Sequence, residues 1–137
     1  MVVMVCLDDK NGMMFNARRQ SKDKILRERI AELVGGSKLW MNAYSAKQFD
    51  AEQLPNIQID EEFLQKAETG EFCFVENQRL ADAEQQIEKL VVFRWNRVYP
   101  ADQFLDLDIT FGSWKILEQA EFAGHSHEKI TMEVYGR

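Results

Sequence analysis

The chain has 137 residues, 45% of them hydrophobic, and a formal net charge of −6. This length and apolar content suit a single domain over residues 1–137 with one hydrophobic core. The acidic balance argues against a nucleic-acid-binding protein, which needs a basic face. No stretch is apolar enough to span a membrane, and the N-terminus lacks the features of a signal peptide, so we expect a cytoplasmic protein with no membrane attachment.

Positive charge is concentrated near the N-terminus. Residues 10–29 contain seven basic and two acidic side chains, a net charge of +5, which leaves −11 on the remainder. Such a segment could bind a small anionic or nucleotide-like ligand, although a solvated helix face is the more common outcome. Cys6 and Cys73 both lie in apolar runs and are expected to be buried and reduced.

The first elements are an apolar strand, a loop and a helix. Val2–Leu7 is apolar without interruption, which is typical of a strand buried on both faces of a parallel sheet. The irregular stretch 8–20 predicts a loop that exposes residues 13–15. A helix capped by Ser21 is expected to run to about Leu33 and to end at the following glycine pair.

Short strands and helical segments then alternate, which predicts right-handed crossovers and a largely parallel sheet. The predicted strands are 38–41, 57–59, 72–75 and 90–95. The predicted helical segments are a turn capped by Ser45, a helix from Asp60 to Gly70, and a stretch through Leu80, Ala83 and Ile87, with a loop at 50–56.

The last third has no predicted helix. Residues 114–122 and 128–135 read as two strands joined by a short turn, and the second alternates apolar and polar side chains. This pattern predicts an antiparallel hairpin at the edge of the sheet. The predicted fold class is therefore α/β: a mostly parallel sheet flanked by helices, ending in a C-terminal antiparallel hairpin.

This order of elements, together with several local strings, resembles dihydrofolate reductase over most of the chain. The strings are residues 88–93, the aromatic and acidic connection 99–108, Trp114 and residues 127–137, and at the start the strand, long loop, helix and strand 39–41. The resemblance implies a dihydrofolate reductase-like fold whose cleft holds a small molecule.

The residues that bind the cofactor in that family are replaced here. The family's Gly-Arg-x-Thr turn is represented by Asn42-Ala43-Tyr44-Ser45, in which only Ser45 keeps a comparable hydroxyl. The family's paired glycines are represented by Glu76-Asn77, which add bulk and negative charge where a pyrophosphate would lie. These substitutions argue against NADPH binding, so no cofactor is predicted.

The resemblance also assigns a carboxylate to the substrate site. Asp23 matches the family's catalytic acid, which could have a raised pKa and share a proton with a ring nitrogen. The simpler alternative is that Asp23 only complements a helix N-terminus. The proline and tryptophan before that helix are replaced in the region 18–20, and a threonine on the last long strand is matched by Phe93.

The only histidines lie in the segment His125-Ser126-His127. A His-x-His pair is half of the metallo-β-lactamase signature, which zinc-dependent ribonucleases share. The full motif needs a following Asp-His and further histidines. We therefore expect neither a metal site nor that activity, but a turn whose histidines are solvated or bonded locally. No Ser-His-Asp set with a known local context is present.

Two hypotheses of function follow. In the first, the protein is a non-enzymatic small-molecule-binding or protein-interaction module that has lost reductase activity. In the second, it is an enzyme that acts on a nucleotide- or pterin-like molecule, with Asp23 or Glu76 as the acid or base. In both, the predicted cleft is lined by Arg18, Arg19, Asn42, Tyr44, Ser45 and Asn77.

Overall fold

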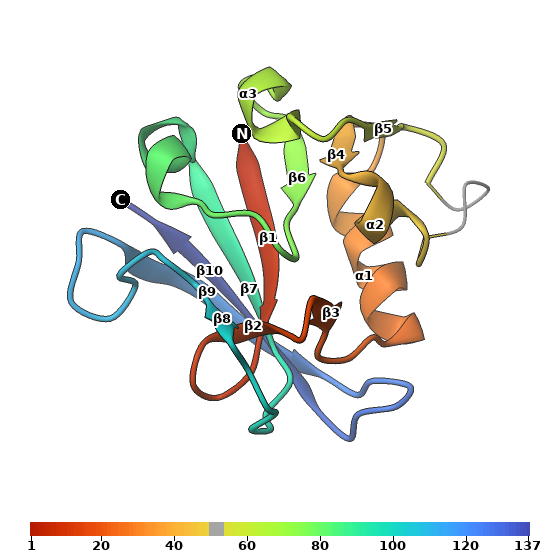
Figure 1. The fold of residues 1–137 in the computed structure, drawn as a ribbon, viewed down its shortest axis with the longest axis vertical. Helices are drawn as coiled ribbons and strands as arrows, with labels where there is room; N and C mark the ends of the chain where they lie inside the picture. The colour runs from red at the N-terminus through yellow and green to blue at the C-terminus, as the bar shows by residue number, and fades with distance from the viewer. Residues whose placement is uncertain (50–53) are drawn as a thin grey trace.

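The computed structural model describes residues 1–49 and 54–137, so part of the predicted loop 50–56 lies outside the described residues. Its main sheet has the strand order β5-β4-β6-β1-β7-β10-β9 (Figure 1). The strands are β1 (Val2–Leu7), β4 (Leu39–Met41), β5 (Ile57–Ile59), β6 (Phe72–Phe74), β7 (Lys89–Arg94), β9 (Lys115–Phe122) and β10 (Ile130–Gly136). The first five strands in space are parallel, and β10 and β9 are antiparallel, as predicted.

β1 lies between β6 and β7 and has apolar side chains on both faces. Val3, Val5 and Leu7 point into one hydrophobic core, and Met4 points into the other. Because successive side chains of a strand point to opposite faces, an unbroken apolar run is what a strand covered on both faces requires.

One face of the sheet is covered by α1 (Lys24–Val34), whose Leu26, Ile30 and Val34 are buried. The predicted cap was wrong: Asp23, not Ser21, is the N-cap. Asp23 has an extended backbone, and its carboxylate accepts hydrogen bonds from the Ile25 and Leu26 amides. A carboxylate serves better than a hydroxyl here because it can accept several amides at the positive end of a helix.

The core on the opposite face includes Met13 and Met14 from a second, three-stranded sheet, which the sequence did not predict. This sheet consists of β2 (Gly12–Phe15), β3 (Arg18–Arg19) and β8 (Gln103–Phe104). The expected exposure of residues 13–15 is wrong for Met13 and Met14, which are 5% and 2% exposed, and is confirmed for Phe15, which is 38% exposed. β2 and β3 are joined by Asn16 and Ala17, both with positive φ, as in the two-residue turns that match strand twist.

The other helices differ from the prediction: α2 (Ala43–Ala46) begins earlier than expected and α3 (Phe63–Lys66) is shorter. α2 is capped by Asn42, whose side chain accepts from the Ser45 amide, so Ser45 is not the cap. α3 begins after Glu62, and a 3₁₀ helix covers Ala81–Gln86. In the described parts of the chain, no helix is both long and apolar enough to cross a membrane.

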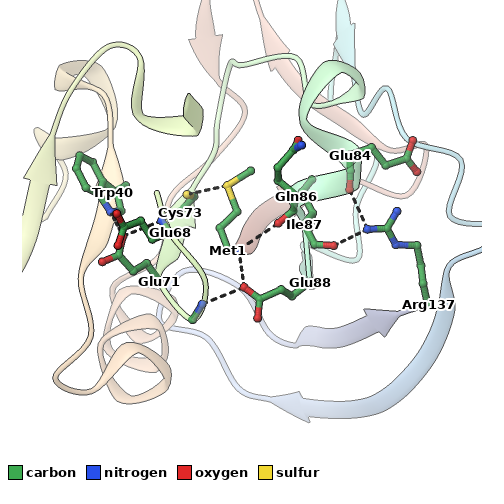
Figure 2. A network of polar contacts seen from close by, with 11 residues as sticks. Met1, Trp40, Glu68, Glu71, Cys73, Glu84, Gln86, Ile87, Glu88 and Arg137 are labelled. Atoms are coloured by element: carbon green, nitrogen blue, oxygen red, sulfur yellow. Dashed lines mark hydrogen bonds and ion pairs between the residues drawn. The ribbon is translucent and has the colours of Figure 1, made fainter. Parts of the chain in front are cut away.

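The amino ends of β1, β6 and β7 are joined by polar contacts (Figure 2). Glu88 accepts hydrogen bonds from the Met1 nitrogen at 2.5 Å and from the Gly70 amide at 2.9 Å. Arg137 donates to the carbonyls of Glu84 and Ile87. These contacts fix the amino ends of the parallel strands. Open α/β sheets bind ligands at the other end, beyond the carboxyl ends of the strands.

Candidate functional site

The carboxyl ends of β4, β6 and β1 bring together most of the predicted cleft residues. Glu76 follows β6, Asn42 follows β4, and Arg19 reaches the same place from β3. Arg19, Tyr44, Ser45 and Glu76 form one hydrogen-bonded network. Asp23 belongs to a separate network. Arg18 directly precedes Arg19 in the sequence, but it is exposed to solvent and takes no part in the contacts described below.

The first network centres on the carboxylate of Glu76, whose side chain is 8% exposed. Arg19 donates from Nε to Oε2 at 2.9 Å and from Nη2 to Oε1 at 3.2 Å, a bidentate pair. The Ser45 hydroxyl donates to Oε1 at 2.8 Å. A buried carboxylate with three such donors is well compensated for its lost hydration.

Tyr44 holds Arg19 in position. The Arg19 guanidinium lies 4.4 Å from the centre of the Tyr44 ring, a cation–π contact, and the Arg19 amide donates to the Tyr44 hydroxyl at 2.8 Å. The short hairpin between β2 and β3 brings Arg19 to this ring. The guanidinium is therefore committed to groups of the protein itself.

The two turns that hold cofactor phosphates in the resembling family are bonded to each other. Asn42 Nδ2 donates to Asn77 Oδ1 at 2.8 Å, while Asn42 Oδ1 accepts from the Ser45 amide. Gln103 Nε2 donates to the Asn77 carbonyl at 2.9 Å. The side chain of Asn42 and the polar groups of Asn77 named here are thus hydrogen-bonded to other groups of the chain and not left free for a ligand.

Cys6, near the carboxyl end of β1, is half-buried. Burial raises the pKa of its thiol well above the ordinary value, and the nearby Glu76 raises it further. Cys73 is buried and also free. A thiol with a raised pKa carries little thiolate at neutral pH, so neither cysteine suits nucleophilic chemistry.

The second network centres on Asp23, which is 1% exposed. Its carboxylate accepts five hydrogen bonds, two from α1 amides and three from the turn of the β9–β10 hairpin: the His125 and Ser126 amides and His127 Nδ1 at 2.9 Å. Burial alone would raise the pKa of Asp23, but these bonds outweigh it and hold the pKa well below its ordinary value. Asp23 therefore stays ionised, contrary to the raised pKa that the resemblance implied.

His127 was expected to be solvated or bonded locally, and that prediction is wrong. The ring is 4% exposed and stacks on Trp95 with centroids 4.5 Å apart. Its Nε2 lies 3.0 Å from the Ser21 hydroxyl and 3.1 Å from the Tyr99 hydroxyl. His125 is exposed. Neighbouring residues carry no signal for these contacts, because Asp23 and Ser21 are 104 and 106 positions away from His127.

No group of three or more His, Cys, Asp or Glu side chains is arranged to hold a metal ion within residues 1–49 and 54–137.

We expect Arg19 and Glu76 to be energetically coupled. In a double-mutant cycle with Arg19→Met and Glu76→Gln, the coupling free energy should be about 2 kcal/mol, because the pair is bidentate and mostly buried. The measurement is the free energy of urea unfolding. The control pair, Lys129 and Glu121, lies 3.5 Å apart with both side chains more than half exposed, and should couple by about 0.5 kcal/mol or less. Equal coupling in the two cycles would contradict this account of the cleft.

The strand order and the similarity to a solved structure define a dihydrofolate reductase-like fold. A dihydrofolate reductase from Enterococcus faecalis, solved as a complex with NADP(H) and RAB-propyl, is similar to this chain with a TM-score of 0.70. The similarity covers 99% of this chain and 95% of the other, at 12% sequence identity, and establishes the fold alone. No protein-family model and no curated protein sequence matches the chain.

Proposed function

We propose that this chain is a small-molecule-binding module of the dihydrofolate reductase-like fold that no longer performs NADPH-dependent reduction. The observation that carries the proposal is the bidentate Arg19–Glu76 pair in the turn after β6. The Enterococcus faecalis structure holds NADP(H), so the fold itself can accommodate the dinucleotide. What argues against binding in this chain is the chemistry of the side chains at the two turns.

Electrostatics make the turn after β6 unfavourable for a phosphate. Two like charges about 4 Å apart repel by about 4 kcal/mol at an effective dielectric constant of about 20. That energy corresponds to about a thousandfold in affinity. In the part of the chain that the structure describes, Arg19 is the only cation bonded to Glu76, and it is already paired. Moving Arg19 to a phosphate would leave the mostly buried Glu76 carboxylate without its charge partner.

A hollow beside this turn supports binding of a different small molecule. It has a volume of about 550 Å³ and lies between α3 and the 3₁₀ helix. Its polar lining includes Glu61, Glu62, Asp82 and Arg79, of which Arg79 lies 3.8 Å from Asp106. This acidic lining favours an uncharged or cationic polar ligand over the anionic ligand that the basic segment 10–29 suggested.

The hollow can be tested with a thermal-shift panel of nucleosides, pteridines and small amines. A ligand that binds the native state raises the midpoint of unfolding. We expect a ligand that does so to lose most of its effect in the variant Glu62→Gln/Asp82→Asn and to keep it in Glu118→Gln, which removes an exposed carboxylate on β9. An equal loss in both variants would show that the hollow is not the site.

Restoring glycines at the turn should restore affinity for the dinucleotide. In Glu76→Gly/Asn77→Gly, the repelling carboxylate is gone, Arg19 is released and the backbone can approach a pyrophosphate. We expect saturable quenching of tryptophan fluorescence by NADPH in this variant, with an affinity at least about tenfold above the limit set by the unmodified chain. The matched control is Glu118→Gly/Gln119→Gly on the exposed strand β9, which should leave NADPH affinity unchanged. An equal rise in both variants, or none in the first, would contradict the role given to Glu76.

A further inference from the structure

Ser21, His127 and Asp23 have the hydrogen-bond order of a serine hydrolase triad. Ser21 Oγ lies 3.0 Å from His127 Nε2, and His127 Nδ1 lies 2.9 Å from Asp23 Oδ2. We propose that Ser21 is a nucleophile and that this site, which is separate from the Arg19–Glu76 network, hydrolyses small carboxylic esters. Serine, histidine and carboxylate in this order on unrelated folds perform this chemistry, and geometry rather than sequence position defines the set.

The protonation pattern of the histidine follows from its partners. Asp23 is ionised and can only accept hydrogen bonds. His127 Nδ1 therefore carries a hydrogen and donates a hydrogen bond to Asp23. In the neutral ring, Nε2 is then an acceptor that faces the Ser21 hydroxyl. Stacking on Trp95 and burial hold the ring in this orientation. Tyr99 also points its hydroxyl at Nε2 and competes with Ser21 for that nitrogen.

The alternative is a purely structural clasp between α1 and the β9–β10 turn. Asp23 alone accounts for that clasp, because it binds both the α1 amides and the turn amides. Ser21 is one of two hydroxyls on Nε2 and is partly exposed, so it can meet a substrate from solvent. A structural role does not require the Ser21 hydroxyl, whereas a hydrolase requires it as the nucleophile.

A hollow of about 650 Å³ adjoins Trp95, the stacking partner of His127. Its other lining residues, Asn96, Arg97, Glu128 and Lys129, are polar or charged. With one aromatic wall and little further apolar surface, it suits a short acyl or alcohol group better than a long chain. Ser21 and His127 do not line this hollow, so the choice of a small ester rests on the triad geometry and on the partly exposed Ser21 hydroxyl, which a small substrate can reach from solvent.

The reaction proceeds in two balanced steps. Ser21 Oγ bonds to the ester carbonyl carbon as its proton passes to His127 Nε2, and the carbon–alkoxy bond then breaks as Nε2 returns that proton to the leaving alcohol. Water next attacks the acyl-serine and gives one proton to Nε2. The bond to Ser21 Oγ breaks, Ser21 regains the proton from Nε2, and the carboxylic acid leaves.

The test uses 4-nitrophenyl acetate hydrolysis and covalent labelling by a fluorophosphonate probe, located by peptide mass spectrometry. We expect labelling at Ser21 and a loss of hydrolysis on the order of 100-fold in Ser21→Ala. Ser113→Ala is the matched control, because Ser113 is an exposed serine outside both networks described above. It should keep full activity and labelling.

Equal activity in Ser21→Ala and the unmodified chain, or absence of label at Ser21, would overturn the proposal. Ser21→Ala removes one partly exposed hydroxyl and leaves the five hydrogen bonds of Asp23, so an equal unfolding midpoint is expected and verifies that the variant is folded. The assay contains no dinucleotide, so its result is independent of whether the cleft binds NADPH.

Discussion

Replacing Asp23 by alanine should lower the free energy of unfolding by about 3–5 kcal/mol, because each buried donor left without an acceptor costs about 1–3 kcal/mol. The carboxylate joins the N-terminus of α1 to the turn between β9 and β10 through five hydrogen bonds. Without it, the His125 and Ser126 amides lose their acceptor in a site with little access to water. Urea unfolding followed by tryptophan fluorescence measures the loss.

Asp108→Ala is the control for this prediction. Asp108 also accepts two backbone amides, from Thr110 and Phe111, but it is exposed and its contacts stay within its own loop. We expect a loss of about 1 kcal/mol or less, because water can replace the lost acceptor. Similar losses in the two variants would show that Asp23 is only another local turn residue.

The effect of Asp23 should depend on pH. Its pKa is lowered in the folded chain, so its contribution to stability is fully present above the unfolded-state pKa of about 4 and is lost as the pH falls toward the lower folded-state value. The difference in unfolding free energy between the unmodified chain and Asp23→Ala should therefore be constant above about pH 5 and should narrow below about pH 4. A difference that stays constant down to pH 3 would contradict the lowered pKa.

Replacing Phe93 by alanine should cost about 3–5 kcal/mol of unfolding free energy, the usual range for a phenylalanine removed from a core. Phe93 is 0% exposed and packs edge-on against Phe122 at 6.5 Å between centroids. It stands where the resemblance places a threonine, so the ring fills space in the core on the α1 side of the sheet. Urea unfolding again gives the measurement.

Phe104→Ala is the matched control for Phe93, since it removes the same side chain from a strand residue that is 49% exposed. It should cost about 1 kcal/mol or less. A loss at Phe93 no larger than that at Phe104 would show that the core is loosely packed around this ring.

Much of the fold was predictable from the sequence, because periodicity reports how many faces of an element are covered. The apolar run of β1 indicated a central strand, and the alternation from Ile130 to Tyr135 indicated an antiparallel strand near an edge. The resemblance to dihydrofolate reductase rested on the order of these elements, and the structural similarity at 12% identity supports that order.

The small sheet β3-β2-β8 was missed for a physical reason. Strands of two to four residues are too short to show an alternation of apolar and polar side chains. The Asn16-Ala17 turn also lacks the glycine that usually marks such hairpins. The helix caps were misplaced because several residues that could cap stand close together. Asp23 lies two positions after Ser21, and Asn42 lies three before Ser45.

The predicted cleft residues Arg19, Tyr44 and Ser45 lie together with Glu76, but the sequence did not indicate how they pair. Arg19 and Glu76 are 57 positions apart, and only the packed hairpin of β2 and β3 shows that they bind each other. The same limit hid the contacts of His127, since a turn histidine is solvated unless distant segments cover it. Trp95 and Ser21 come from such segments.

The central claim is that the cleft has lost NADPH binding, and the most direct measurement is a titration of the unmodified chain with NADPH. Quenching of Trp40, Trp95 and Trp114 reports binding, and the unfolding midpoint reports stabilisation by a native-state ligand. We predict no saturable quenching and no rise in the midpoint up to millimolar NADPH. Saturable binding at micromolar concentration, lost in Ser45→Ala or Asn77→Ala, would contradict the account and restore a reductase as the leading function.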